Sequence, residues 1–277
     1  MNAGLWSWRS SRSRRRWEFG MACLGIPHAP FIAAVLASCM AITLRAQTSR
    51  DSNALGWFAY IGDHDVAGDW QLHVEGQWRR SEVVLGWQQL LLRPAMTYRI
   101  NRSWSAGAGY VYSRTYPYGA FPDPFATPEH RAFEQLSAEH SIGKWDLSHR
   151  IRLEQRFLGQ LPDPPSPVVD RWRYRNRIRY ELSTQRSLSK AFYLVASVEP
   201  NVRIGVNYRG RALDQIQSFI AIGRHIRQNW RVETGYSHQY GVPRTGTVFE
   251  SNHTLQLRVR SSSSLAGLFR PAKTADR

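Results

Sequence analysis

The chain has 277 residues, 42% hydrophobic content and a formal net charge of +16, and its only lysines are Lys144, Lys190 and Lys273. This length allows one large domain or two small ones, and the hydrophobic content is that of a folded protein. Beyond the N-terminal region, no run approaches the roughly 18–20 apolar residues of a membrane-spanning helix, which excludes helical spans from the main body.

The first 46 residues have the order of a secretory signal. A basic opening at residues 9–16 precedes an apolar run at residues 31–44, and Ala46 occupies the small-residue position before a cleavage site. We therefore predict a signal peptide over residues 1–46, after which the mature chain is still basic.

Three other interpretations of this region remain open. They are a retained anchor, a twin-arginine signal at Arg15 and Arg16, and a lipoprotein cleavage box with Cys39 as the lipid-bearing residue; translation could also begin at Met21. Cys23 and Cys39 are the only cysteines, and both precede the predicted cleavage site. The mature chain is therefore expected to lack disulfides and thiolate metal sites.

The mature chain alternates polar and apolar residues with a period of two. In residues 145–158, one face carries leucine, isoleucine and phenylalanine, and the other carries Arg150, Arg152, Glu154 and Arg156. Residues 104–112, 230–240 and 253–260 repeat the pattern, whereas a helix would scatter each set around its circumference. The segments reach about 10–14 residues, which exceeds the usual soluble strand and suits the strands of a membrane barrel.

These features predict an all-β fold: a single up-and-down antiparallel transmembrane β-barrel. Ten strands are expected, with 12 allowed, because an even number leaves both ends of the chain on one side. The predicted strands are 70–80, 87–100, 103–114, 129–142, 145–158, 171–183, 191–201, 213–226, 229–240 and 251–261. Residues 55–62 are an eleventh candidate that breaks this parity. The predicted organisation is a signal peptide (1–46), an N-terminal segment (47–69), the barrel (70–261) and a flexible tail (262–277).

Tryptophans open several of the predicted strands. Such residues form the aromatic girdle where a barrel meets lipid headgroups. The predicted girdle residues are Trp104, Trp145, Trp172 and Trp230.

The stretch "RWRYRNRIRY" at residues 171–180 places five arginines on alternate positions. An arginine facing hydrocarbon costs about 2–4 kcal/mol at the midplane, so this row must face inward, where cross-strand glutamates can pair with it. The predicted lumen charge network contains Glu129, Arg131, Glu139, Arg150, Arg152, Glu154, Arg156, Arg173, Arg175, Arg177, Arg179, Glu181, Glu199, Arg231 and Glu233.

Several short motifs resemble those of the domain of unknown function 2490 family, secreted proteins predicted to form outer-membrane β-barrels. The motifs are "LRPAMTYRI" (92–100), "EHR" (129–131) with Gln135, "HR" (149–150) through "EQR" (154–156), the arginine row at 173–179, Glu199 with Asn201, and "NHTLQL" (252–257). The resemblance covers roughly residues 57–261 and implies a barrel in the outer membrane, without an assigned activity. The chain departs from the usual barrel pattern because it does not end in a strand with a terminal aromatic.

The sequence therefore predicts a bacterial outer-membrane barrel that is either structural or a small pore biased toward anions, since arginine rings favour anions. Its expected partners are outer-membrane lipid, the barrel-assembly machinery and an anionic solute. A nucleic-acid-binding sheet is disfavoured by the secretion signal, the oligomeric state is open, and no cofactor or metal is expected.

The alternative is a rim enzyme that acts on lipid or lipopolysaccharide. Ser251 and His253 lie at i and i+2, so they share one face of a strand, with Glu250, Ser237 and His238 nearby. The same face carries Leu255 and Leu257, as expected of a bilayer-facing surface. The scattered histidines, including His73 beside Glu75, do not specify a metal site, and no catalytic residue is assigned.

Overall fold

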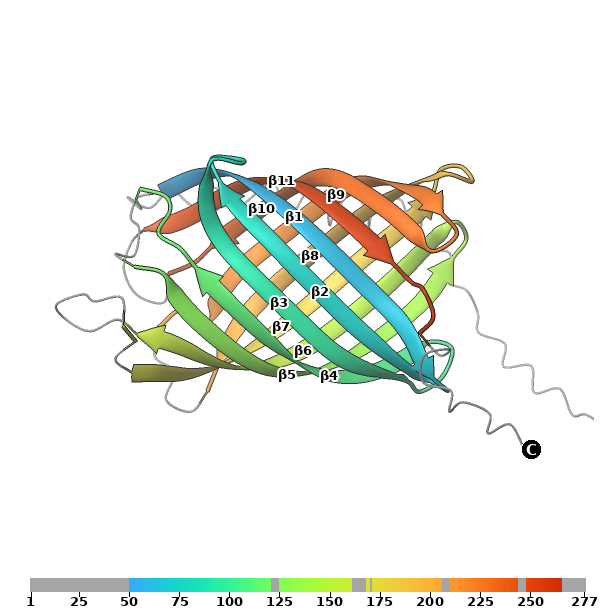
Figure 1. Ribbon diagram of the computed structural model, residues 1–277, viewed down its shortest axis with the longest axis horizontal. Coiled ribbons are helices and arrows are strands. Elements are labelled where there is room, and N and C mark those ends of the chain that lie inside the picture. Colours follow the sequence, from blue (N-terminus) through green and yellow to red (C-terminus); the bar gives the residue numbers. More distant parts are fainter. Residues whose placement is uncertain are drawn as a thin grey trace, which may run out of the picture. The chain divides into compact units, whose positions relative to one another are not determined.

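A computed structural model describes residues 50–120, 125–160, 168–169, 171–205, 210–243 and 248–265. These residues form a closed β-barrel of eleven strands, and none of them belongs to a helix (Figure 1). The predicted signal peptide lies outside the described residues, as do residues 266–277 of the predicted tail. No helix within the described ranges is long and apolar enough to cross a membrane.

The strands follow one another around the barrel in chain order. Their bounds are β1 Arg50–Ala67, β2 Trp70–Ser81, β3 Gly86–Arg99, β4 Trp104–Thr115, β5 Thr127–Ile142, β6 Trp145–Gln160, β7 Arg171–Ser187, β8 Phe192–Ile204, β9 Leu213–Arg227, β10 Trp230–Gly241 and β11 Phe249–Ser261. The predicted all-β, up-and-down barrel is therefore confirmed.

The predicted strand number of ten or twelve is wrong, because the eleventh candidate is a strand of the barrel. Residues 55–62 lie inside β1, which pairs antiparallel with β2 and parallel with β11. An odd number of alternating strands leaves the first and last pointing the same way, so the barrel closes through one parallel pair. The barrel consequently begins at Arg50 rather than at residue 70.

The connections divide between two rims. The short-turn rim carries residues 68–69, 100–103, 143–144, 188–191 and 228–229, and Gly68 and Gly143 have positive φ there, as tight turns favour. At the other rim, which we call the long-loop rim, β2 is followed by β3, β4 by β5, β6 by β7, β8 by β9 and β10 by β11. β1 starts at the long-loop rim, and β11 ends at the short-turn rim. The expectation that both ends of the chain lie on one side of the barrel is therefore also wrong.

Burial in this barrel is the reverse of burial in a soluble protein. Buried charged residues such as Glu154, at 0% exposed, point inward, while large apolar side chains at alternate positions point outward and are exposed. The outward set includes Val74, Leu92, Ile151, Leu153, Ile220, Ile222, Leu255 and Leu257. The inner apolar cluster contains Leu91, Ala95, Val111 and Phe133. Period-two alternation produces this arrangement because successive side chains of a strand point to opposite faces.

Candidate functional site

The inner faces of β5 to β9 carry a connected set of ion pairs, which we call the charged wall: Glu129, Arg131, Glu154, Arg156, Arg177, Arg179, Glu199, Arg203 and Asp214. At its centre, the Glu154 carboxylate accepts hydrogen bonds from Arg177 Nη2 at 2.6 Å and Arg179 Nη1 at 3.0 Å. Arg131 Nη1 lies 3.7 Å from the same carboxylate. Register explains this convergence, since Glu154 is directly opposite Arg177 on β7.

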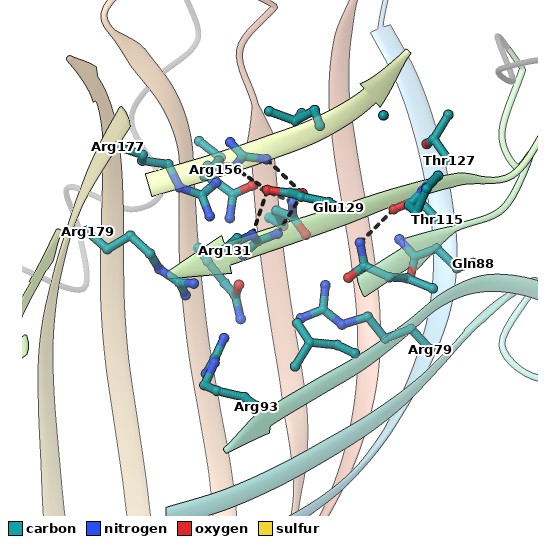
Figure 2. A pocket seen from close by; sticks show the side chains of 18 of the residues that line it. Arg79, Gln88, Arg93, Thr115, Thr127, Glu129, Arg131, Arg156, Arg177 and Arg179 are labelled. Carbon is teal, nitrogen blue, oxygen red and sulfur yellow. Dashed lines mark hydrogen bonds and ion pairs between the residues drawn. The ribbon is translucent and has the colours of Figure 1, made fainter. Parts of the chain in front are cut away.

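Glu129 separates arginines that would otherwise repel one another. Arg131 and Arg156 are direct cross-strand partners of like charge, an arrangement that destabilises a sheet when nothing intervenes. Glu129 accepts hydrogen bonds from Arg131 Nε at 2.7 Å and from Arg156 Nη2 at 3.1 Å (Figure 2). The Glu129 carboxylate on β5 therefore bridges an arginine of β5 and an arginine of β6.

Asp214 and Glu199 extend the charged wall to β8 and β9. Asp214 accepts a hydrogen bond from Arg177 Nη1 at 2.8 Å and also pairs with Arg156 and Arg203. Glu199 pairs with Arg179. The Arg177 guanidinium thus bridges two carboxylates, one from β6 and one from β9.

A second group of charges lies on the opposite side of the interior. On β2 and β3, Glu75 pairs with Arg93 at 2.6 Å and lies 3.5 Å from His73, which contacts Asp63 on β1 at 2.7 Å. Arg260 on β11 lies 3.6 Å from the same Asp63 and links the group across the parallel closure of the barrel.

Some inward arginines lie against aromatic rings instead of carboxylates. The Arg79 guanidinium is 3.9 Å from the Trp57 ring centroid, and the Arg152 guanidinium is 4.3 Å from that of Phe133. Neither arginine lies within 4.0 Å of a carboxylate oxygen in the described part of the chain, and Arg152 donates to Gln135 at 2.7 Å. A cation over an aromatic face gains electrostatic stabilisation without losing its net positive charge.

Two cavities occupy the interior. The larger, of about 890 Å³, reaches toward the short-turn rim, and the smaller, of about 280 Å³, lies toward the long-loop rim. Arg79, Arg93 and Arg179 line both, so guanidiniums surround the level at which the cavities adjoin. The smaller cavity is strongly cationic: its lining contains six arginines and one carboxylate, Glu129 (Figure 2).

The segment after β4 reaches toward the other side of the long-loop rim. Tyr118 lines the smaller cavity and donates a weak hydrogen bond to Glu250 on β11 at 3.4 Å, while the Ala120 amide donates to Asp51 on β1 at 3.3 Å. Burial, reinforced by the Glu250 charge, raises the pKa of Tyr118 to about 12. This segment therefore narrows the entrance at that rim.

Between charged ends, the inner faces of β10, β11 and β1 carry an uncharged stretch that we call the neutral wall: Ser237, Asn252, Thr254, Gln256, Leu55, Trp57 and Ile61. Toward the short-turn rim the same faces carry Asp63, Glu233, Arg258 and Arg260. All seven residues of the neutral wall are buried. Ser237 Oγ, Asn252 Nδ2, Thr254 Oγ1 and Gln256 Nε2 make no hydrogen bond to any described residue.

The predicted charge network divides into buried and more exposed members. Arg150 pairs with Glu181 outside the central cluster. The half-buried Arg231 and the exposed Glu139 line the larger cavity, Arg173 is exposed near the long-loop rim, and Arg175 is half-buried opposite Arg156.

Sequence reasoning missed several inward charged residues: Asp63, Arg79, Arg93, Arg203, Asp214, Arg258 and Arg260. Glu233, which it included, lies 3.9 Å from both Arg258 and Arg260. The alternation of β3 and β11 could have identified Arg93, Arg258 and Arg260, whereas Asp214 stands at a strand end, where the pattern is weakest.

The four predicted girdle tryptophans occupy both rims. Trp104, Trp145 and Trp230 open strands at the short-turn rim, and Trp172 lies near the long-loop rim; Trp145 is half-buried and the others are exposed. Further exposed aromatics lie outward at the two ends of the strands: Trp70, Trp78, Trp87, Tyr98 and Phe192.

Among the described residues, no group of three or more histidine, cysteine, aspartate or glutamate side chains is arranged to hold a metal ion. No curated protein and no solved structure matches the chain. The model of one family, described as protein of unknown function (DUF2490), matches residues 55–250, a region that runs from β1 into β11 and includes the charged wall. The chain belongs to this family, as its motifs predicted.

Proposed function

We propose that the protein is a bacterial outer-membrane β-barrel whose narrow, arginine-rich interior conducts small anions. The reversed burial carries the membrane part of this proposal. An outward surface of exposed leucine, isoleucine and valine, flanked by aromatic residues at both rims, matches a hydrocarbon layer between two interfaces. The interior charges, in contrast, are shielded from that layer and paired with one another.

The anion preference follows from the excess of guanidiniums over carboxylates in the lining, although every arginine of the smaller cavity except Arg79 pairs with a carboxylate. The smaller cavity has six guanidiniums and one carboxylate in its lining, and Arg79, at the junction of the two cavities, contacts an aromatic ring rather than an acid. Rings of arginine bias a pore toward anions because the fixed positive potential favours entry of negative ions. Outer-membrane lipid and the barrel-assembly machinery are the partners that this placement requires.

The first experiment compares the gel mobility of the unboiled and boiled protein in a separated outer-membrane fraction. A folded barrel is expected to migrate faster before boiling. Recovery of the protein as a soluble periplasmic species without a mobility shift would reject the membrane placement.

The pore is tested in planar bilayers under a salt gradient, where the reversal potential reports selectivity. We expect discrete conductance steps with anion preference in the wild type. Arg79→Ala should shift the reversal potential toward cations, because it removes a positive charge between the two cavities. Arg80→Ala is the matched control, since Arg80 lies on the outward face of the same strand and donates to the Val84 carbonyl.

If a correctly folded barrel gave no conductance steps, the pore proposal would be rejected and a purely structural role would remain. Equal shifts for Arg79→Ala and Arg80→Ala would show that overall charge, rather than the charge at the junction, sets the selectivity.

A further inference from the structure

The outward face of β10 and β11 near the long-loop rim carries a serine between two histidines. Ser251 Oγ lies 3.0 Å from His238 Nε2 and 3.4 Å from His253 Nε2. His253 Nδ1 lies 2.7 Å from the Tyr236 hydroxyl. All four side chains belong to the set that alternates outward with the exposed Leu255 and Leu257.

One assignment of protons satisfies every contact of this cluster. His238 Nε2–H donates to Ser251 Oγ, the serine hydroxyl donates to His253 Nε2, and His253 Nδ1–H donates to the Tyr236 oxygen. The His253 imidazole is then neutral: its Nε2 accepts the hydrogen bond of the serine hydroxyl, and its Nδ1–H is fixed by the Tyr236 oxygen. This is the arrangement that activates a serine nucleophile.

Two other histidine–tyrosine pairs on the outward face show what is particular to this cluster. His149 bonds to Tyr180 at 2.8 Å, and His130 bonds to Tyr110. Within the described ranges, neither of these pairs has a serine hydroxyl among its hydrogen-bond partners. Pairing a histidine with a tyrosine is therefore a general device of this outer surface. A serine also joins the Tyr60–His64 pair, since Ser261 Oγ lies 2.8 Å from the Tyr60 hydroxyl and 3.4 Å from His64 Nε2. What distinguishes the β10–β11 cluster among the described residues is a serine placed between two imidazoles.

We propose that Ser251, His253 and Tyr236 form a catalytic site that cleaves ester-linked acyl chains of a membrane lipid. The proposal rests on the membrane placement proposed above, which brings the outward face of β11 against lipid at the level of an interface. His253 is exposed and Ser251 is 9% exposed beside it, so a lipid ester would approach the hydroxyl along the imidazole. The Tyr240 and Phe249 rings, stacked 5.7 Å apart, lie between this cluster and the long-loop rim.

The reaction balances with water as the co-reactant. Ser251 Oγ attacks the ester carbonyl carbon while His253 Nε2 takes the hydroxyl proton, and the tetrahedral intermediate expels the lipid alcohol, which takes that proton from His253. Water then attacks the acyl-serine ester, His253 accepts its proton, and the fatty acid leaves as Ser251 regains the proton. The Nε2–H of His238, which already points at Oγ, is placed to donate to the oxyanion.

Arg50 gives this surface a positive charge for an anionic headgroup. Its guanidinium lies 6.0 Å from the Tyr240 ring centroid, and Arg50 is exposed at the start of β1, whose Ser52 is the register partner of Ser251. Phospholipids and lipid A both combine acyl esters with phosphate, so the chemistry of the site fits either source.

The test measures fatty acid released by the purified, folded full-length chain from phosphatidylethanolamine vesicles and, separately, from purified lipopolysaccharide. We expect release from one of the two, and this result identifies the source of the ester. Ser251→Ala and His253→Gln should each lower the rate by at least about 100-fold, the range in which general-base catalysis contributes. Tyr236→Phe should cause a smaller loss because the base remains but is no longer oriented.

His149→Gln is the matched control, because it breaks an equivalent outward pair that lacks a serine and should leave release unchanged. A fluorophosphonate probe should label Ser251 in the wild type and lose that label in His253→Gln, an effect that a structural role would not produce. Folding of each variant is checked by the mobility shift of the unboiled protein, which also separates failure of the site from failure of the barrel. No release from either lipid, or equal release by folded Ser251→Ala, would overturn the proposal.

Discussion

The charged wall of β5–β9 buries charged groups that pair with one another, whereas the neutral wall of β10, β11 and β1 buries polar atoms that have no hydrogen-bond partner among the described residues. In the charged wall, Glu154 is fully buried and lies within ion-pair distance of three guanidiniums. In the neutral wall, Thr254 is equally buried, but its hydroxyl makes no hydrogen bond to any described residue. Removing one partner of an ion pair should therefore lower the free energy of unfolding in the charged wall. Removing an unpaired polar atom should not lower it in the neutral wall.

Glu154→Gln tests the charged wall with the largest expected effect. The amide keeps the shape of the carboxylate but leaves Arg131, Arg177 and Arg179 without their shared negative charge. Removing one partner from a buried ion pair typically costs about 3–5 kcal/mol. The free energy of unfolding, measured by urea titration with the folded fraction read from gel mobility, should fall by about that amount.

Glu134→Gln is the control for this change, since Glu134 lies on the outward face of β5, is exposed and accepts a hydrogen bond from Gln155 at 3.0 Å. The same chemical substitution there should leave the unfolding free energy unchanged or slightly higher. Equal losses at the two positions would show that the charged wall contributes no specific stability.

The charged wall could be predicted from sequence because its alternation is strong. The predicted strands at 145–158 and 229–240 end within two residues of β6 and β10, and Arg177 and Glu154 were placed on the same inner face. Individual partners could not be predicted, because they depend on register. Register sets Arg177 opposite Glu154 and Arg175 opposite Arg156.

The neutral wall could not be predicted because β1 lacks the polar–apolar alternation that marks the other strands. Its inward residues Leu55, Trp57 and Ile61 are apolar, and so are outward residues such as Phe58. A strand that is apolar on both faces has no period-two signal, and a parity argument then favoured ten strands. The parallel closure is a property of the whole barrel, which no single segment encodes.

Gly109→Ala tests the packing of Phe133 and Arg152 beside the charged wall and should have an intermediate effect. A Cβ at Gly109 would lie 2.6 Å from Phe133 Cζ and 2.6 Å from the Pro94 carbonyl oxygen, so the ring must move. Phe133 is 1% exposed and carries the Arg152 guanidinium on its face. Overpacking of this kind costs about 1–3 kcal/mol, and we expect a loss in that range by the same urea titration.

Gly76→Ala is the control on β2, where the nearest atom to an added Cβ is Leu92 Cδ2 at 3.7 Å, an ordinary contact. Its stability should change little. If Gly109→Ala were equally silent, the close packing of β4 on Phe133 would not be needed to hold Arg152.

Thr254→Val tests the neutral wall and should have the smallest effect, with the opposite sign. Valine has nearly the shape of threonine, so the packing is kept while a buried hydroxyl without a partner among the described residues is removed. Leaving a polar group unsatisfied costs about 1–3 kcal/mol, whereas the isosteric apolar group carries no such penalty. The urea midpoint should therefore stay constant or rise. A fall of more than about 1 kcal/mol in the unfolding free energy would mean that the hydroxyl binds water inside the barrel, and the two walls would then differ in the partner used rather than in whether their polar groups are paired.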